Sequence, residues 1–196
     1  MIRKVAHILS KWLLKTGAIS EVDLELYEYG IYSFLFTLIP LFAVIVLSFP
    51  LHITFEGILF IIPFILLRKF TGGFHFSSAW LCTLVSIVVL SAFLLEIKVL
   101  ILSSQSIPAY VAVYLSLIPI VTLSPIDSVN RRLTHKEKAI FRKIAICLGI
   151  IFAALFTLFM LLGVPHIAIP IGAGVVLTAL LQLPCLWELR KNMSHE

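Results

Sequence analysis

Apolar runs of roughly 15 to 20 residues recur six times along the chain, and short polar segments separate them. The runs fall into three pairs, over residues 31–67, 81–123 and 144–184. None of them alternates strictly between apolar and polar residues, as a transmembrane β-strand would. We therefore expect an all-α polytopic membrane protein with about six transmembrane helices, forming a single membrane domain over residues 1–196.

The composition agrees with this pattern. Hydrophobic residues make up 61% of the chain and charged residues only 13%, whereas a soluble domain carries about 25% charge. A chain that uses the bilayer as its solvent must satisfy its own backbone hydrogen bonds, which favours helices. We expect no cleaved signal peptide, because the first apolar run starts behind about thirty charged and amphipathic residues.

The charges predict how the chain is oriented. Six spans place the segments 1–30, 68–80, 124–143 and 185–196 on one side of the membrane, and these carry every Lys and Arg except Lys98. The positive-inside rule makes that side cytoplasmic, together with both termini. The net charge of +5 then reflects topology and contact with anionic inner-leaflet lipids, and we expect no nucleic-acid partner.

Residues 2–15 are predicted to form an amphipathic helix with one apolar and one basic side. The apolar side holds Ile2, Val5, Leu9, Trp12 and Leu13, and the basic side holds Arg3, Lys4, His7, Lys11 and Lys15. Such a helix suits the membrane surface. Packing against the helix bundle as a cap is an equally weighted alternative.

The segment 68–80 and the start of the next span contain the chemistry-bearing residues. A cysteine attacks a carbonyl as its thiolate, so Cys82 needs a base or a local positive field. Ser77 or Ser78 is a candidate N-cap for the third span, which would place Cys82 at or just beyond a helix N-terminus that favours an anion. His75 is the candidate base that takes the thiol proton and returns it to the leaving amine.

The spacing of His75 and Cys82 limits how they can cooperate. On one straight helix their Cα atoms would be separated by about 10.5 Å along the axis, too far for a direct hydrogen bond. A catalytic pair therefore requires a break in the helix between residues 75 and 82. Gly72 and Gly73 have the backbone freedom to let His75 fold back, so we expect a re-entrant or looped catalytic segment.

The remaining residues of this segment have two interpretations each. Arg68 binds either a substrate carboxylate or a neighbouring helix carbonyl, and Lys69 is interpreted as an interfacial anchor. Nearby aromatic residues form either a membrane-interface belt or the wall of a water-poor site. These are Phe70, Phe74, Phe76 and Trp80.

The pattern of Arg68, Gly73, His75 and Cys82 between the second and third spans resembles the signature of the AgrB family, bacterial membrane peptidases that process quorum-sensing propeptides. The acidic, aromatic segment 21–30 and the Pro–Asp–Asn–basic segment 124–131 resemble other parts of that family. The resemblance covers nearly the whole chain, and its His/Cys motif is the specific part.

The resemblance implies a concrete activity. Cys82 would be the nucleophile and His75 the general base of a cysteine endopeptidase in the bacterial cell membrane. The partner would be an AgrD-like propeptide with an amphipathic leader, cut through an acyl-thioester on Cys82 and released as a thiolactone or lactone ring. A homodimer is also implied, while Gly72, Gly73 and Ser78 would support the catalytic segment.

The other polar residues carry weaker signals. Arg131, Arg132 and Lys136 either face lipid headgroups, which is slightly favoured, or bind the acidic tail of the propeptide. We expect no cofactor and no metal, because the His and Cys residues form no zinc-binding pattern, and Cys147 and Cys185 are interpreted as inert apolar residues. The alternative functions are a small polytopic transporter or exporter of a peptide, and a scaffold without chemistry.

Overall fold

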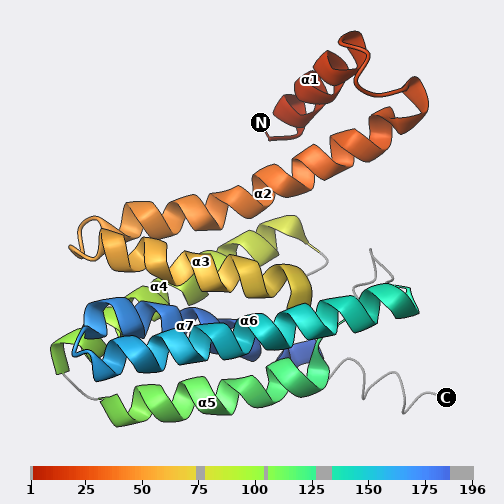
Figure 1. The fold of residues 1–196 in the computed structure, drawn as a ribbon. Coiled ribbons are helices and arrows are strands. Elements are labelled where there is room, and N and C mark those ends of the chain that lie inside the picture. The colour runs from red at the N-terminus through yellow and green to blue at the C-terminus, as the bar shows by residue number, and fades with distance from the viewer. Residues whose placement is uncertain (1, 74–77, 104–105, 127–133, 186–196) are drawn as a thin grey trace.

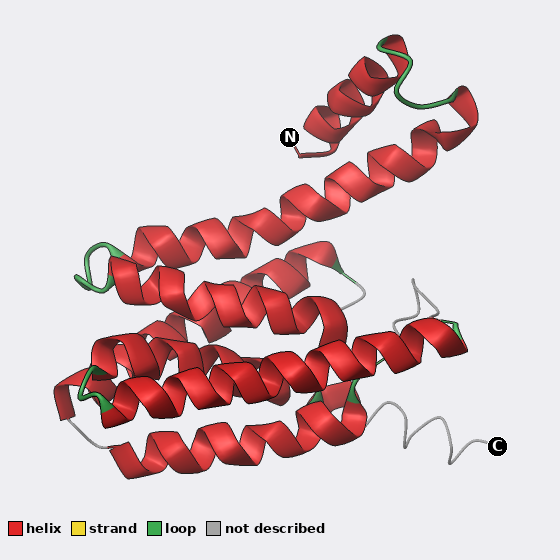
Figure 2. Ribbon diagram, viewed as in Figure 1, coloured by secondary structure: helices red, strands yellow, loops and turns green. Residues whose placement is uncertain are grey.

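A computed structural model describes residues 2–73, 78–103, 106–126 and 134–185 (Figure 1). Within these ranges the chain forms helices and short connections, with no strand (Figure 2). The elements are α1 Ile2–Lys15, the 3₁₀ turn η1 Glu21–Asp23, α2 Leu24–Ser48, α3 Thr54–Thr71, α4 Ala79–Ser103, α5 Ser106–Leu123, α6 His135–Leu161 and α7 Pro165–Leu180. The predicted all-α class is confirmed.

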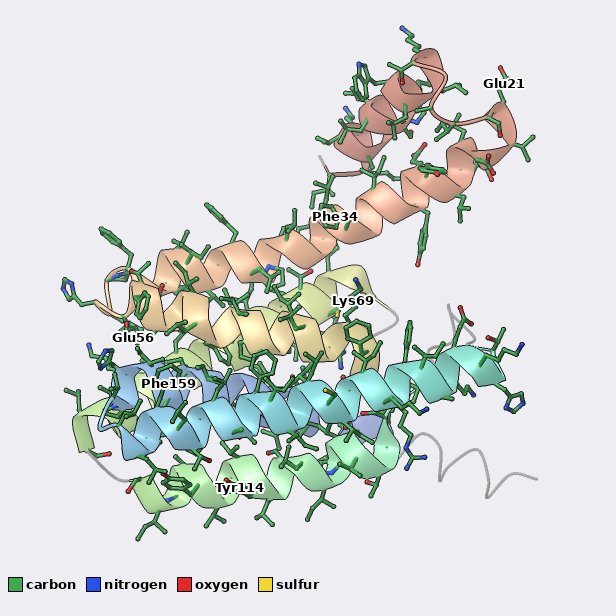
Figure 3. All side chains as sticks on the ribbon, viewed as in Figure 1. Glu21, Phe34, Glu56, Lys69, Tyr114 and Phe159 are labelled. Carbon is green, nitrogen blue, oxygen red and sulfur yellow. The ribbon has the colours of Figure 1, made fainter. Side chains whose placement is uncertain are left out.

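Among the described residues, five helical stretches are long and apolar enough to cross a membrane: Glu21–Ser48, Trp80–Ser103, Ser106–Leu123, His135–Leu161 and Pro165–Cys185. The predicted second span corresponds to α3, which is not one of these five. Its 18 residues include Glu56 in the first turn and Arg68 and Lys69 in the last. Figure 3 shows Glu56 and Lys69 at opposite ends of α3. A helix of this length is about 27 Å long, close to the thickness of the hydrocarbon core, and α3 as a sixth span remains a prediction.

The helix α7 forms the centre of the bundle, where it packs against α3, α4, α5 and α6. Of its membrane-length window, 61% is buried inside the protein, against 6% for that of α2. Small residues allow this close packing. A Cβ at Gly172 would lie 2.8 Å from side-chain atoms of Phe156 and Val113, and one at Gly174 would lie 2.8 Å from the carbonyl oxygen of Phe60.

The amphipathic helix α1 has the bounds predicted from the sequence and packs on the N-terminal part of α2, away from the other helices (Figure 1). Ala6 and Ser10 are buried in this contact, and Nδ1 of His7 lies 2.7 Å from Oε2 of Glu28. Apolar side chains nevertheless remain exposed on α1: Val5, Ile8, Leu9 and Trp12. The helix therefore contacts α2 through small residues and keeps an apolar surface that fits a membrane interface.

Several boundaries differ from the predicted ones. The polar stretch 124–143 is not a loop throughout, because α6 begins at His135. Thr134 and Glu137 form a reciprocal capping box, which satisfies backbone donors at the start of the helix. The first span also starts earlier than residue 31, since α2 begins at Leu24. The predicted tail 185–196 lies outside the described residues except for Cys185.

The close approach of Gly174 to α3 gives a stability prediction. Replacing Gly174 with Ala should destabilise the protein by about 1–3 kcal/mol, because the new methyl group meets Pro63 and the Phe60 carbonyl. Gly30→Ala is the matched control, since Gly30 is also helical and a Cβ there has no neighbour within 4 Å. Thermal unfolding in detergent measures both variants, and equal stability of the two would contradict this account of the packing.

Candidate functional site

The candidate site starts where the chain leaves α3. Gly72 has φ 70° and Gly73 has φ 141°, conformations that residues with a side chain rarely adopt. The helix ends at Thr71, and α4 begins only at Ala79. The predicted interruption between residues 75 and 82 is therefore present. His75 itself lies outside the described residues, so its return toward Cys82 stays a prediction.

Gly72 is held by the segment that follows α5. The N–H of Ile126 donates to the carbonyl oxygen of Thr71 at 2.9 Å. A Cβ at Gly72 would overlap the carbonyl oxygen of Ile126. Position 72 therefore requires glycine for two reasons: the backbone has a positive φ, and the Ile126 backbone occupies the space that a side chain would need.

Gly73 is enclosed from another direction. A Cβ there would overlap Nη1 of Arg68 and would lie 3.1 Å from the carbonyl oxygen of Leu181, just after α7. The end of α3, the segment after α5 and the end of α7 thus meet at the two glycines. Segments that lie far apart in the sequence form one site at this end of the bundle.

The partly buried Arg68 side chain contacts both glycines. Its Nη1 donates to the carbonyl oxygen of Gly72 at 2.8 Å, and the Thr71 hydroxyl donates to the same oxygen at 3.2 Å. The guanidinium also interacts electrostatically with the thiols of Cys185 and Cys82. Of the two roles expected for Arg68, the structure shows a carbonyl contact, although the carbonyl belongs to the turn after the same helix.

Cys82 lies in the first turn of α4. Its backbone N–H donates to the carbonyl oxygen of Ser78 at 3.0 Å, so Ser78 precedes the helix, at the place expected for a cap. The thiol is partly buried. The thiol therefore lies at the N-terminal end of a helix, on the side of the bundle where Arg68 holds the Gly72 turn.

A buried polar pair near the site was missed in the sequence. The side-chain Nε2 of Gln182 donates to the hydroxyl oxygen of Ser124 at 2.8 Å, across 58 residues of chain. The N–H of Cys185 donates to the Gln182 carbonyl oxygen at 3.1 Å. Cys185, interpreted as inert, is buried and interacts electrostatically with Arg68. The available signal was Gln182 itself, a polar residue inside an apolar run.

The described aromatic and basic candidates lie in different parts of the bundle. Phe70 packs against Phe141 of α6, with ring centroids 5.5 Å apart, and Trp80 contacts Phe36 of α2 at 6.1 Å. Lys136 is exposed in the first turn of α6. The other candidates, Phe74, Phe76, Arg131 and Arg132, lie outside the described residues.

The turn gives a second stability prediction. Gly72→Ala should destabilise the protein more than Gly163→Ala does, because both glycines have φ 70° but only Gly72 has a neighbour within 4 Å. Gly72 also has ψ −155°, and this combination with a positive φ is essentially restricted to glycine, which costs other residues about 1–3 kcal/mol. Overpacking against Ile126 adds about 1–3 kcal/mol. Thermal unfolding of the two purified variants tests this difference, and equal losses would contradict both the strain and the overpacking at Gly72.

Comparison with known proteins shows which family the chain belongs to. The family model for AgrB, accessory gene regulator B, matches residues 2–186. An AgrB-like protein 2 of Clostridium perfringens strain 13 and an AgrB-like protein of Clostridium perfringens strain SM101 are each 28% identical over 89 residues. That match covers 45% of this chain and 42% of each relative, less than half of their length. No solved structure matches the chain. Because the family model spans nearly all of the sequence, the chain belongs to the AgrB family.

Proposed function

We propose that this chain is a membrane-embedded cysteine endopeptidase that cleaves an AgrD-like propeptide in a bacterial quorum-sensing system. The observation that carries this proposal is the position of Cys82, partly exposed in the first turn of α4, after the turn at Gly72 that Arg68 holds by a hydrogen bond. Membership of the AgrB family supports the same activity. In this proposal Cys82 is the nucleophile and His75 the general base.

The first half of the reaction acylates the enzyme. His75 takes the proton of the Cys82 thiol, and the thiolate attacks the scissile carbonyl and forms a carbon–sulfur bond. The carbon–nitrogen bond then breaks, and His75 returns the proton to the leaving amine. The C-terminal part of the propeptide departs, and its N-terminal part remains as a thioester on Cys82.

The second half closes a ring. A Cys thiol or Ser hydroxyl within the bound peptide attacks the thioester carbonyl, and the Cys82 thiolate leaves and takes up a proton. The product is a thiolactone in the first case and a lactone in the second. Because water would hydrolyse the thioester, the site must exclude it until the ring closes.

The start of α4 also offers donors for the oxyanion that forms during each attack. The N–H groups of residues 79–81 lie in the first turn of α4, where a helix leaves backbone donors without an intrahelical acceptor. Backbone N–H groups of this kind stabilise tetrahedral intermediates. Trp80 and Leu81 therefore place two candidate donors directly before the nucleophile.

The propeptide would reach the site along the inner leaflet. The exposed apolar face of α1 includes Leu9 and Trp12, which fits a helix at a membrane surface beside an amphipathic leader. In this arrangement both termini and the catalytic segment face the cytoplasm, and anionic lipids lie against the basic residues. We propose Arg131, Arg132 and Lys136 as contacts for lipid headgroups or for an acidic propeptide tail, and a homodimer as the assembly.

Replacing Cys82 tests the proposed activity. In liposomes, Cys82→Ala should reduce propeptide cleavage about 10³-fold or more, because no nucleophile remains to form the thioester. Cys147→Ser is the matched control and should cleave normally, since Cys147 is an exposed thiol on α6. Mass spectrometry of the peptide measures cleavage, and the mass of the protein reports a thioester that hydroxylamine removes.

Two results would contradict this assignment. Unchanged cleavage by correctly inserted Cys82→Ala would show that Cys82 is not the nucleophile. Peptide transport without cleavage by the unaltered protein would instead indicate an exporter.

A further inference from the structure

A buried hydrogen bond ties α7 to the segment that holds the Gly72 turn. Gln182 and Ser124 are 0% and 4% exposed, and their side chains are 2.8 Å apart. Ser124 begins the short segment that ends with Ile126, whose backbone bonds to Thr71 and occupies the space beside Gly72. The link therefore runs from Gln182 through Ser124 to the turn that leads into the catalytic segment.

The residues on either side of Gln182 reach the same place. The carbonyl oxygen of Leu181 lies against Gly73, and Cys185, one turn further along, lies near the Arg68 guanidinium. Gln182 thus sits in the part of the chain that borders both glycines and the charged centre of the site. Movement of this segment would displace both the Gly72 turn and the Arg68 side chain.

Stability does not explain this buried amide. Within the described part of the chain, Oε1 of Gln182 is the single buried side-chain oxygen or nitrogen with no hydrogen-bond partner. Leaving such an acceptor unpaired is destabilising. Turning the amide over would leave Nε2 unpaired in its place. A methionine of similar length would fill the same space and remove the unpaired oxygen, although it would also remove the hydrogen bond to Ser124. Packing alone therefore does not require a glutamine here, and the polar pair is better explained by what it positions.

We propose that Gln182 is a positioning residue for the acylation of Cys82, an inference that rests on the peptidase function proposed above. Through Ser124 it fixes residues 124–126 against Thr71 and Gly72, whose carbonyl oxygen accepts from the Arg68 guanidinium. A rotation of this turn would therefore move the guanidinium relative to Cys82. A displacement of about 1 Å at a reacting group can lower a rate about 10²-fold.

The test compares Gln182→Met with Thr178→Val in single-turnover acylation of Cys82 by the propeptide. Thr178 is the matched control: it is fully buried one turn earlier in α7, and its hydroxyl donates only to Gly174 of its own helix, at 2.8 Å. We expect Gln182→Met to lower the maximal acylation rate about 10- to 100-fold. The propeptide concentration at half-saturation should change less than about threefold. The rates are compared per folded protein, with the folded fraction taken from thermal unfolding, because methionine leaves the Ser124 hydroxyl without this partner. Thr178→Val should acylate at the rate of the unaltered protein.

Ser124→Ala gives an independent arm with a smaller change in volume. Because Gln182 acts through Ser124, the single variants should be similarly slow, and the double variant should be no slower than the slower single. An unchanged rate in Gln182→Met or Ser124→Ala, additive losses in the double variant, or a rate that falls only as far as the folded fraction would each overturn the proposal.

Cys82→Ala in the same assay separates this inference from the function on which it rests. If Cys82→Ala still cleaves the propeptide, the peptidase assignment itself fails. If Cys82→Ala is inactive while Gln182→Met acylates normally, only the positioning role of Gln182 is refuted.

Discussion

The carbonyl oxygen of Gly72 is the acceptor on which the organisation of the site depends. A helix that ends near lipid leaves carbonyl groups that the protein itself must satisfy, because the hydrocarbon core offers no water. At the end of α3, Arg68 and Thr71 both donate to the carbonyl of Gly72. This bonding fixes the turn and places the guanidinium inside the protein, where it is an electrostatic neighbour of Cys82. The same bonds that end the helix therefore hold a positive charge near Cys82.

The close packing of the turn gives this arrangement a single geometry. Glycine at both positions lets the Ile126 backbone approach from one side and Arg68 with Leu181 from the other. The three segments come from the ends of α3, α5 and α7, and their relative positions are set by the core of the bundle. The helix α7 is the most buried of the candidate spans, and Gln182 follows its end. The packing of the core therefore fixes the position of Gln182, which in turn bonds to Ser124 near the site.

The sequence predicted those features of the fold that depend on local patterns of residues. Apolar runs indicated the helices, the periodicity of residues 2–15 matched the bounds of α1, and the two glycines marked the end of α3. The start of α6 was missed, although Thr134 and Glu137 have the spacing of a capping box, because the surrounding basic residues suggested a loop. The pair of Gln182 and Ser124 could not be predicted, since 58 residues separate them and no periodicity relates them. The placement of His75 lies outside the described residues, so its pairing with Cys82 is still known only as a pattern in the sequence.

The electrostatics of the site also restrict which residue can attack. A thiolate in this part of the protein needs nearby positive charge, because burial alone disfavours an anion. Cys147 is exposed on α6, in a membrane-length span, and is not in the first turn of its helix. Cys185 does lie near Arg68, but it is buried and follows the end of α7, where a helix dipole is negative. Cys82 alone among the three combines partial exposure with the first turn of a helix, a setting that agrees with its proposed role as the nucleophile.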